Sequence, residues 1–208
     1  MSQDQSNQGA EKPKPGLLQV ALGGVAIFGV VAVVYIIAQA SINPQSKSDL
    51  KSLARGEMAK LAILTEAGPA PATRFLDAQG KSVGLADFRG KVVVINTWAT
   101  WCGPCVLEMP TLAKLATEYQ GQPVEVIALS IDGPREADKA AAFIAKYPPL
   151  KLYRDPTLKF PYDLKPAAVG LPTTVIYGRD GVERARLAGG ADWSGKDAKA
   201  VIDHVLAQ

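Results

Sequence analysis

The sequence contains very little cysteine and histidine, with two cysteines and one histidine in 208 residues. A structural zinc site takes four ligands, and only Cys102, Cys105 and the distant His204 are on offer, so no metal is expected. Two cysteines separated by two residues close a loop too small to brace a fold. The scarcity therefore favours chemistry at the Cys102–Cys105 pair over a scaffolding role.

The chain also lacks an excess of charge of either sign. Its formal net charge is +3, with 21% charged and 48% hydrophobic residues. This composition gives no reason to expect a nucleic-acid partner, and it argues against general disorder. The length suits one ordinary domain preceded by a tail.

One long stretch near the N-terminus carries no charged residue. After a polar tail (residues 1–16), residues 17–38 are almost entirely apolar. As a helix they would span about 33 Å, enough to cross a bilayer core of about 30 Å. We predict an uncleaved transmembrane anchor rather than a buried core helix, although residues 38–40 have the small-x-small pattern of a cleavage site. Positive charges do not decide the orientation; we expect the short tail inside and the globular part exported.

The remaining sequence alternates strand and helix patterns. Residues 39–67 are predicted to be a linker with a short helix capped by Asp49, and residues 68–208 to be the folded domain. Such alternation predicts an α/β fold, with a central mixed sheet and helices on both faces. The predicted strands are 73–77, 82–85, 91–97, 124–131, 150–154, 173–177 and 182–187, and the predicted helices 102–119, 137–147 and 197–207.

The cysteine pair lies where a buried strand turns into a helix. This places Cys102 at the helix N-terminus, where unpaired backbone N–H groups and the helix dipole favour a thiolate. Cys105, one turn inside, should be less exposed. The spacing suits thiol–disulfide exchange, in which Cys102 attacks a substrate disulfide and Cys105 resolves the mixed disulfide. A chance Cys-x-x-Cys or half of a metal site is the alternative interpretation.

The sequence around the pair resembles a known family. Trp98-Ala99-x-Trp101-Cys102-Gly103-Pro104-Cys105 is similar to the thioredoxin active site. Residues 88–96, 108–110 and 170–174 resemble the TlpA/ResA/CcmG group, and residues 187–193 look most like TlpA. The resemblance covers residues 68–208. It implies a thioredoxin-like fold on a protein tethered to the bacterial inner membrane and facing the periplasm.

The resemblance also assigns a substrate-binding region. It implies a cis peptide bond between Leu171 and Pro172, with Pro172 facing the cysteines and the neighbouring backbone pairing with a substrate peptide. An ordinary turn proline is the alternative. Trp101 should cover the disulfide and contribute to docking, whereas Trp98 should pack inside and His204 should lie at a surface or helix end. The full set of predicted substrate-binding residues is Trp101, Gly103, Pro104, Leu171, Pro172 and Thr173.

A carboxylate is predicted to adjust the thiols. Thioredoxins carry a buried aspartate six residues before the first cysteine, and this chain has Asn96 there, which cannot carry a proton. Glu108 follows Cys105 by three residues, so it can approach from the same helix face. The family pattern favours Glu108 as the group that tunes thiol pKa and moves protons. The alternative is a solvated helix residue.

The expected activity is that of a protein-disulfide reductase whose only redox group is the Cys102–Cys105 disulfide. The Gly-Pro dipeptide resembles thioredoxin, whose potential is about −270 mV. Electrons would come from a membrane transporter of DsbD or CcdA type. The likeness to TlpA implies a partner in the assembly of cytochrome oxidase copper sites.

Three alternatives remain. A CcmG-like reductant of apocytochrome c usually carries Gly-x-Pro-Glu, and this chain has Gly170-Leu171-Pro172-Thr173. A tethered copper-binding chaperone would need Cys-x-x-x-Cys and a nearby histidine. This chain has a different cysteine spacing and no histidine near the motif. A peroxidase of related fold is disfavoured because the resolving cysteine is only two residues away.

Overall fold

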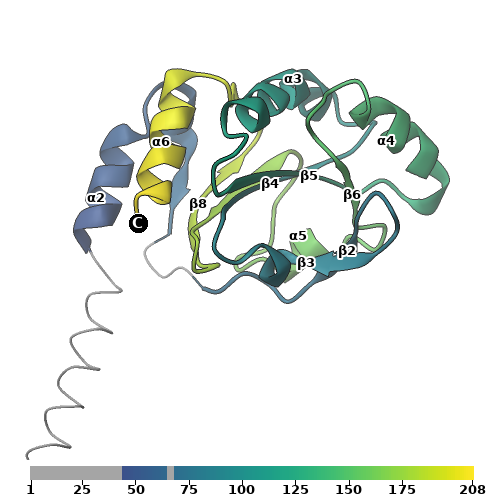
Figure 1. The fold of residues 1–208 in the computed structure, drawn as a ribbon, viewed down its shortest axis with the longest axis horizontal. Helices are drawn as coiled ribbons and strands as arrows, with labels where there is room; N and C mark the ends of the chain where they lie inside the picture. The colour runs from purple at the N-terminus through teal and green to yellow at the C-terminus, as the bar shows by residue number, and fades with distance from the viewer. Residues whose placement is uncertain (1–43, 65–67) are drawn as a thin grey trace, which may run out of the picture. The chain divides into compact units, whose positions relative to one another are not determined.

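The computed structural model describes residues 44–64 and 68–208, and its strands form one mixed sheet (Figure 1). Neighbouring strands follow the order β1-β8-β7-β4-β5-β6-β2-β3. β4 pairs in parallel with β5, and β5 with β6, while the other pairs are antiparallel. The strands are β1 (Ala62–Ile63), β2 (Arg74–Leu76), β3 (Ser82–Gly84), β4 (Val92–Trp98), β5 (Val124–Ser130), β6 (Leu152–Arg154), β7 (Thr173–Tyr177) and β8 (Glu183–Ala188).

Helices cover both faces of this sheet. In Figure 1, α3 and α4 lie on one side and α5 on the other. This arrangement is the predicted thioredoxin-like α/β fold with a mixed central sheet. The α-helices are α2 (Pro44–Leu53), α3 (Gly103–Glu118), α4 (Ala137–Ile144), α5 (Lys159–Asp163) and α6 (Lys196–Leu206), and the 3-10 helices are η1 (Gly56–Lys60), η2 (Leu85–Phe88) and η3 (Pro134–Glu136).

The central strand β4 separates two hydrophobic cores. All seven of its residues are buried, as its β-branched sequence predicts. Because successive side chains point to opposite faces, Val94 belongs to the core that contains Leu112 of α3, while Ile95 belongs to the core that contains Phe160 of α5. Packing on both faces therefore fixes the strand, and its C-terminal end leads directly into the cysteine motif.

The segment before residue 68 is more structured than a linker. Leu50, Met58 and Leu61 are buried in the same core as α3, and β1 extends the sheet by pairing with β8. The prediction that Asp49 caps a helix is wrong, because α2 already begins at Pro44. Gly56 begins η1 with a φ of 55°, a left-handed conformation that a side chain would oppose. The apolar spacing was visible in the sequence, but its docking on the sheet was not.

The predicted membrane anchor at residues 17–38 lies outside the described residues. Within residues 44–64 and 68–208, no helix is both long and apolar enough to cross a membrane. The predicted tail at residues 1–16 likewise lies outside the described part.

Two hairpins form where turn residues predicted them. Residues 77–81 join β2 to β3, and residues 178–182 join β7 to β8. Helix α5 was not predicted, since it has five residues and a proline within it. A contact with the preceding segment fixes its start, because the buried Asp155 carboxylate accepts a hydrogen bond from the backbone N–H of Phe160 at 2.7 Å.

The burial of η1 predicts a large effect on stability. Met58 is 1% exposed, so Met58→Ala should lower the free energy of unfolding of the full-length protein by about 2–5 kcal/mol, through lost burial and the cavity left behind. Lys60→Ala changes an exposed residue of the same helix and should stay within about 0.5 kcal/mol. Urea unfolding measures both. Equal, small effects of the two variants would show that this segment is only a linker.

Candidate active site

The cysteine pair lies at the junction between β4 and α3. Cys102 is the residue that caps the N-terminus of α3, and its Sγ accepts a hydrogen bond from the backbone N–H of Cys105 at 3.3 Å. The two cysteines form a disulfide. Cys102 is 7% exposed and Cys105 is fully buried. The predictions that Cys102 begins the helix and that Cys105 is the more buried residue are confirmed.

A buried aspartate fixes the turn that leads into Cys102. Both Asp132 carboxylate oxygens accept from the backbone N–H of Thr100, at 3.0 and 3.1 Å, and the Thr100 hydroxyl donates at 2.8 Å. The Ser130 hydroxyl donates to the same carboxylate at 2.9 Å. Sequence reasoning missed Asp132. Its position just after β5 was the available signal, because the C-terminal ends of the parallel strands β4 and β5 meet at one edge.

Glu108 is buried beside the strand that precedes the cysteines. Only 4% of the residue is exposed, so the interpretation as a solvated helix residue is wrong. One carboxylate oxygen accepts from Asn96 Nδ2 at 2.8 Å. The other accepts from the backbone N–H of Ala191 and from Nε1 of Trp193, both at 3.1 Å. A carboxylate thus lies one helical turn after Cys105, held by three donors.

Burial raises the pKa of the Glu108 carboxyl above its ordinary value of 4.5, and the three donors offset this in part. Asn96 also donates to Thr174 Oγ1 at 2.8 Å, which ties β4 to β7. The Oδ1 atom of Asn96 is buried and has no hydrogen-bond partner among the described residues. Asn96 therefore orients Glu108 as a donor and does not itself carry a proton.

Residues 189–193, which lie in the connection between β8 and α6, form one wall of the site. A Cβ added at Gly190 would lie 3.6 Å from the carbonyl oxygen of Pro104 and 3.9 Å from Glu108 Oε2, so the backbone passes close to the motif. The Thr111 hydroxyl of α3 accepts from the backbone N–H of Trp193 at 3.1 Å. Sequence reasoning quoted residues 187–193 only as a likeness, and it did not assign Trp193 to the site.

The proline loop reaches the same end of the sheet. The bond between Leu171 and Pro172 is cis, as predicted, and Leu171 packs against the core cluster that includes both cysteines. Thr173 is buried, and its hydroxyl donates to the carbonyl oxygen of Gly170 at 2.7 Å. The backbone N–H of Gly189 donates to the carbonyl oxygen of Pro172 at 2.8 Å. These contacts join the proline loop to the wall formed by residues 189–193.

The tryptophans differ as expected. Trp98 is fully buried and its ring lies 5.2 Å from that of Phe143, which confirms a packing role. Trp101 is 66% exposed, and Leu107 on the first turns of α3 is 80% exposed. Gly103 and Pro104 form the first turn of α3. Two large apolar side chains next to the disulfide are thus open to solvent.

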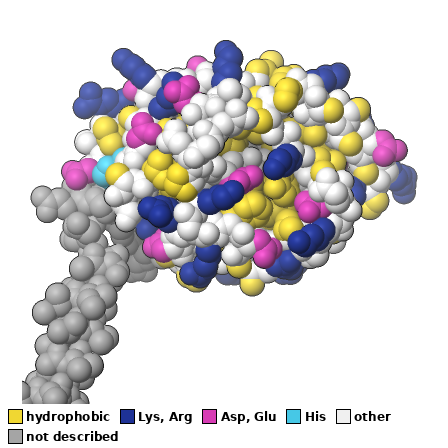
Figure 2. Space-filling model, viewed as in Figure 1, with side chains coloured by type: hydrophobic (Ala, Val, Ile, Leu, Met, Phe, Trp, Pro, Cys, Tyr) yellow, Lys and Arg dark blue, Asp and Glu magenta, His cyan; other side chains and the backbone are white. Residues whose placement is uncertain are grey.

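The face of the domain drawn in Figure 2 carries no dominant charge. Lysine and arginine side chains there are interspersed with aspartate and glutamate, and apolar side chains lie between them. His204 lies in the last turn of α6. Within the described part of the chain, no group of three His, Cys, Asp or Glu residues could hold a metal ion.

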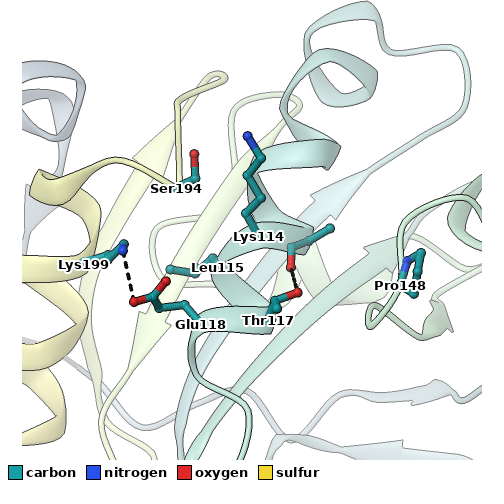
Figure 3. A pocket seen from close by; sticks show the side chains of 8 residues that line it. Lys114, Leu115, Thr117, Glu118, Pro148, Ser194 and Lys199 are labelled. Atoms are coloured by element: carbon teal, nitrogen blue, oxygen red, sulfur yellow. Dashed lines mark hydrogen bonds and ion pairs between the residues drawn. The ribbon is translucent and has the colours of Figure 1, made fainter.

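A pocket of about 700 Å³ lies between α3 and α6 (Figure 3), and neither cysteine lines it. Lys199 of α6 pairs with Glu118 of α3 across it at 3.1 Å. Its lining is partly polar and includes Lys114 and Ser194. The cysteine pair is thus reached from the protein surface at the N-terminal end of α3 and not through this pocket.

The arrangement suits disulfide exchange. Cys102 lies at a helix N-terminus, where backbone N–H groups and the dipole stabilise a thiolate. Cys105 can close a disulfide with it, and Glu108 can exchange a proton at the buried end of the pair. The two cysteines and a carboxylate able to accept a proton all lie within about two turns of one helix.

Comparison with known proteins agrees with this geometry. The Redoxin family model matches residues 65–202. The thiol-disulfide oxidoreductase ResA of Bacillus thuringiensis subsp. konkukian is 36% identical over 114 residues, covering 50% of this chain and 59% of that protein. ResA of Bacillus subtilis is 32% identical over 121 residues, covering 57% and 64%. The chain thus spans less than two thirds of the length of these relatives.

A solved structure shares the fold. A candidate thiol:disulfide interchange protein DsbE from Chlorobium tepidum superposes with a TM-score of 0.60 at 26% sequence identity. The match covers 69% of this chain and 99% of that one. The two chains therefore share one fold over this part of the sequence.

The raised pKa of Glu108 predicts a pH-dependent stability. The folded protein binds this proton more tightly than the unfolded chain, so the contribution is complete below about pH 4.5 and is lost as pH rises through the folded pKa. The substitution Glu108→Gln removes the titrating carboxyl and, with it, this pH-dependent contribution to stability. The difference in unfolding free energy, variant minus wild type, should increase with pH across that window, by at most about 1.4 kcal/mol per pH unit.

Urea unfolding of the oxidised proteins between pH 4 and pH 8 measures this difference. Asp138→Asn, at an acid on α4 away from the site, is the matched control and should follow the wild type. Parallel curves for the wild type and Glu108→Gln would contradict the prediction.

Proposed function

Because the chain belongs to the Redoxin family and, within it, to the TlpA/ResA/CcmG group, we propose that it is a thiol–disulfide oxidoreductase that reduces disulfides in partner proteins. One observation carries the proposal: Cys102 of the Cys102–Cys105 disulfide caps α3, and the buried Glu108 follows Cys105 by one turn. Structural disulfides have no need of a buried carboxylate with a raised pKa beside them.

The reaction proceeds in two exchanges. In the reduced protein, the Cys102 thiolate attacks one sulfur of the substrate disulfide, forming a mixed disulfide and expelling the other sulfur as a thiolate. Cys105 then loses its proton to Glu108, and its thiolate attacks Cys102 Sγ. The Cys102–Cys105 disulfide closes and the second substrate thiolate leaves. Two electrons pass to the substrate, and Glu108 returns the proton to the departing thiolate.

The exposed apolar residues are where a partner would dock. Trp101 and Leu107 flank the disulfide and are largely open to solvent. Gly103 and Pro104 keep the first turn of α3 free of bulky side chains. The backbone of Leu171, just before the cis-proline, is where an extended substrate segment would pair, because Thr173 already pairs with β4 and β8 and the Pro172 carbonyl accepts from Gly189.

Residues 17–38 would anchor the protein in the bacterial inner membrane, with the catalytic domain in the periplasm. The support is the length of this uncharged stretch. A reductant in an oxidising compartment needs electrons from inside, so a membrane thiol transporter of DsbD or CcdA type would regenerate the dithiol.

The partner we propose is a protein of cytochrome oxidase copper-site assembly. Residues 187–193 support it, because they resemble TlpA and hold Glu108 in this structure. Thr173, where CcmG-type proteins carry glutamate, leaves the proline loop without a charge at that position. The DsbE-like solved structure keeps apocytochrome c as the second candidate.

Trapping identifies the partner. Cys105→Ser should accumulate mixed disulfides through Cys102, because the resolving thiol is gone. Non-reducing electrophoresis and mass spectrometry of cell extracts detect them. Cys102→Ser is the control and should trap nothing. A copper-site protein among the adducts supports the leading proposal, apocytochrome c supports the second candidate, and no adduct at all would argue against a reductase.

A redox titration tests the direction of electron flow. Equilibration of the full-length protein with glutathione or dithiothreitol buffers should give a potential near that of thioredoxin, about −270 mV. A value near that of DsbA, about −120 mV, would make the protein an oxidant and overturn the proposed direction.

A further inference from the structure

The indole of Trp193 contacts the redox centre from a part of the chain that is distant in sequence. Its Nε1 donates to Glu108 Oε2 at 3.1 Å, across 85 residues of sequence. Trp193 is fully buried, so this contact is shielded from water. The residue lies after β8, outside the motif that carries the cysteines. The two exchange steps themselves involve Cys102, Cys105 and Glu108 and give Trp193 no role.

The position of this indole is fixed from several sides. The backbone N–H of Trp193 donates to Thr111 Oγ1 at 3.1 Å, and the Thr111 hydroxyl donates to the carbonyl oxygen of Glu108 at 2.7 Å. The backbone N–H of Ala191 donates to the same Glu108 oxygen as the indole. Residues 191–193 therefore hold both the backbone and the carboxylate of Glu108. A ring that only filled space would not need its N–H aimed at a carboxylate.

We propose that Trp193 is a positioning residue for thiol–disulfide exchange, whose indole N–H keeps the Glu108 carboxylate ionised and aimed to accept the Cys105 proton. The proposal rests on the proposed function. A hydrogen bond to an ionised acceptor is about twice as strong as a neutral one, so the donor favours the carboxylate over the acid. It counteracts the burial that favours the acid. Trp193 acts through Glu108 and does not touch the substrate.

No other charged side chain in the described parts of the chain contributes to the raised pKa of Glu108. β4 and β7 present Asn96 and Thr174, which do not titrate. In the connection between β8 and α6, the Asp192 carboxylate accepts a hydrogen bond from the Ser194 hydroxyl at 2.7 Å. The backbone N–H of Asp192 donates to the Glu57 carboxylate of η1. The other titratable groups of α3 and its cap are Cys102, Cys105, Lys114, which acts on Asp192, and Glu118, which pairs with Lys199. In the oxidised protein, where the cysteines do not titrate, the Glu108 titration should therefore be a single step.

The molecule offers a matched control for this test. Trp98 and Trp193 are both fully buried, and Trp98 Nε1 has no hydrogen-bond partner among the described residues. Trp98→Phe and Trp193→Phe each remove a buried indole N–H and shrink the ring. Only the second removes a donor from Glu108. A difference between them separates the hydrogen bond from the loss of packing.

The experiment follows oxidation of the reduced full-length protein by oxidised glutathione in a single turnover between pH 4.5 and pH 8.5. Acid quenching and mass spectrometry give the rate of closure of the Cys102–Cys105 disulfide. Trp193→Phe should move the acidic midpoint of this rate up by about one pH unit, because the lost donor raises the pKa of Glu108. Trp98→Phe should leave the midpoint in place.

Glu108→Gln should abolish this midpoint, and adding Trp193→Phe to it should change the pH profile no further. A second readout does not depend on activity: carbon NMR of the Glu108 carboxyl in the oxidised protein should show the same upward shift. If Trp193→Phe fails to fold, benzothienylalanine at position 193 keeps the shape of the ring without its N–H.

The outcomes are distinct. An unchanged midpoint in the Trp193 variants overturns this proposal while the oxidoreductase function stands. A shift that persists in the Glu108→Gln background overturns it too, since Trp193 would then act on the thiols directly. A wild-type protein that does not exchange with glutathione overturns the proposed function, and the positioning role with it.

Discussion

The structure is organised around one buried carboxylate. Taking Glu108 out of water is costly unless several donors replace the lost solvation, and three donors from two other parts of the chain do so. Asn96 comes from the central strand, and Ala191 and Trp193 come from the connection between β8 and α6. The carboxylate thus binds α3 to both. The position of the cysteines at the start of α3 depends on the same contacts.

Local signals were enough to predict most of the sheet and the cysteine site. The β-branched run of β4, the glycine turns and the Cys-Gly-Pro-Cys tetrapeptide each specify their structure over a few residues. The parts that were missed depend on distant partners. Asp132 bonds Thr100 across 32 residues, and Trp193 bonds Glu108 across 85. Local periodicity carries no information on such contacts, so Glu108 could not be separated from an exposed helix residue.

The segment before residue 68 shows the same limit at the level of the fold. Its apolar spacing was recognised, yet a linker and a docked segment share that pattern. Met58 is buried in the core beside α6, and Glu57 of the same 3-10 helix accepts a hydrogen bond from the backbone N–H of Asp192. The chain that would follow a membrane anchor therefore contacts the loop that holds Glu108. Stability of the domain and support of the site are supplied by the same segment.

The substitution of asparagine for the usual aspartate at position 96 has a further consequence. Two acids in one buried place would share a proton and titrate as a coupled pair, so neither pKa would belong to one residue. Asn96 removes one of them and contributes a donor in its place. In the proposed mechanism, proton exchange at the buried end of the cysteine pair then depends on Glu108. The groups that surround Glu108, and above all the two donors from residues 191–193, would in that case decide the pH at which Cys105 is activated.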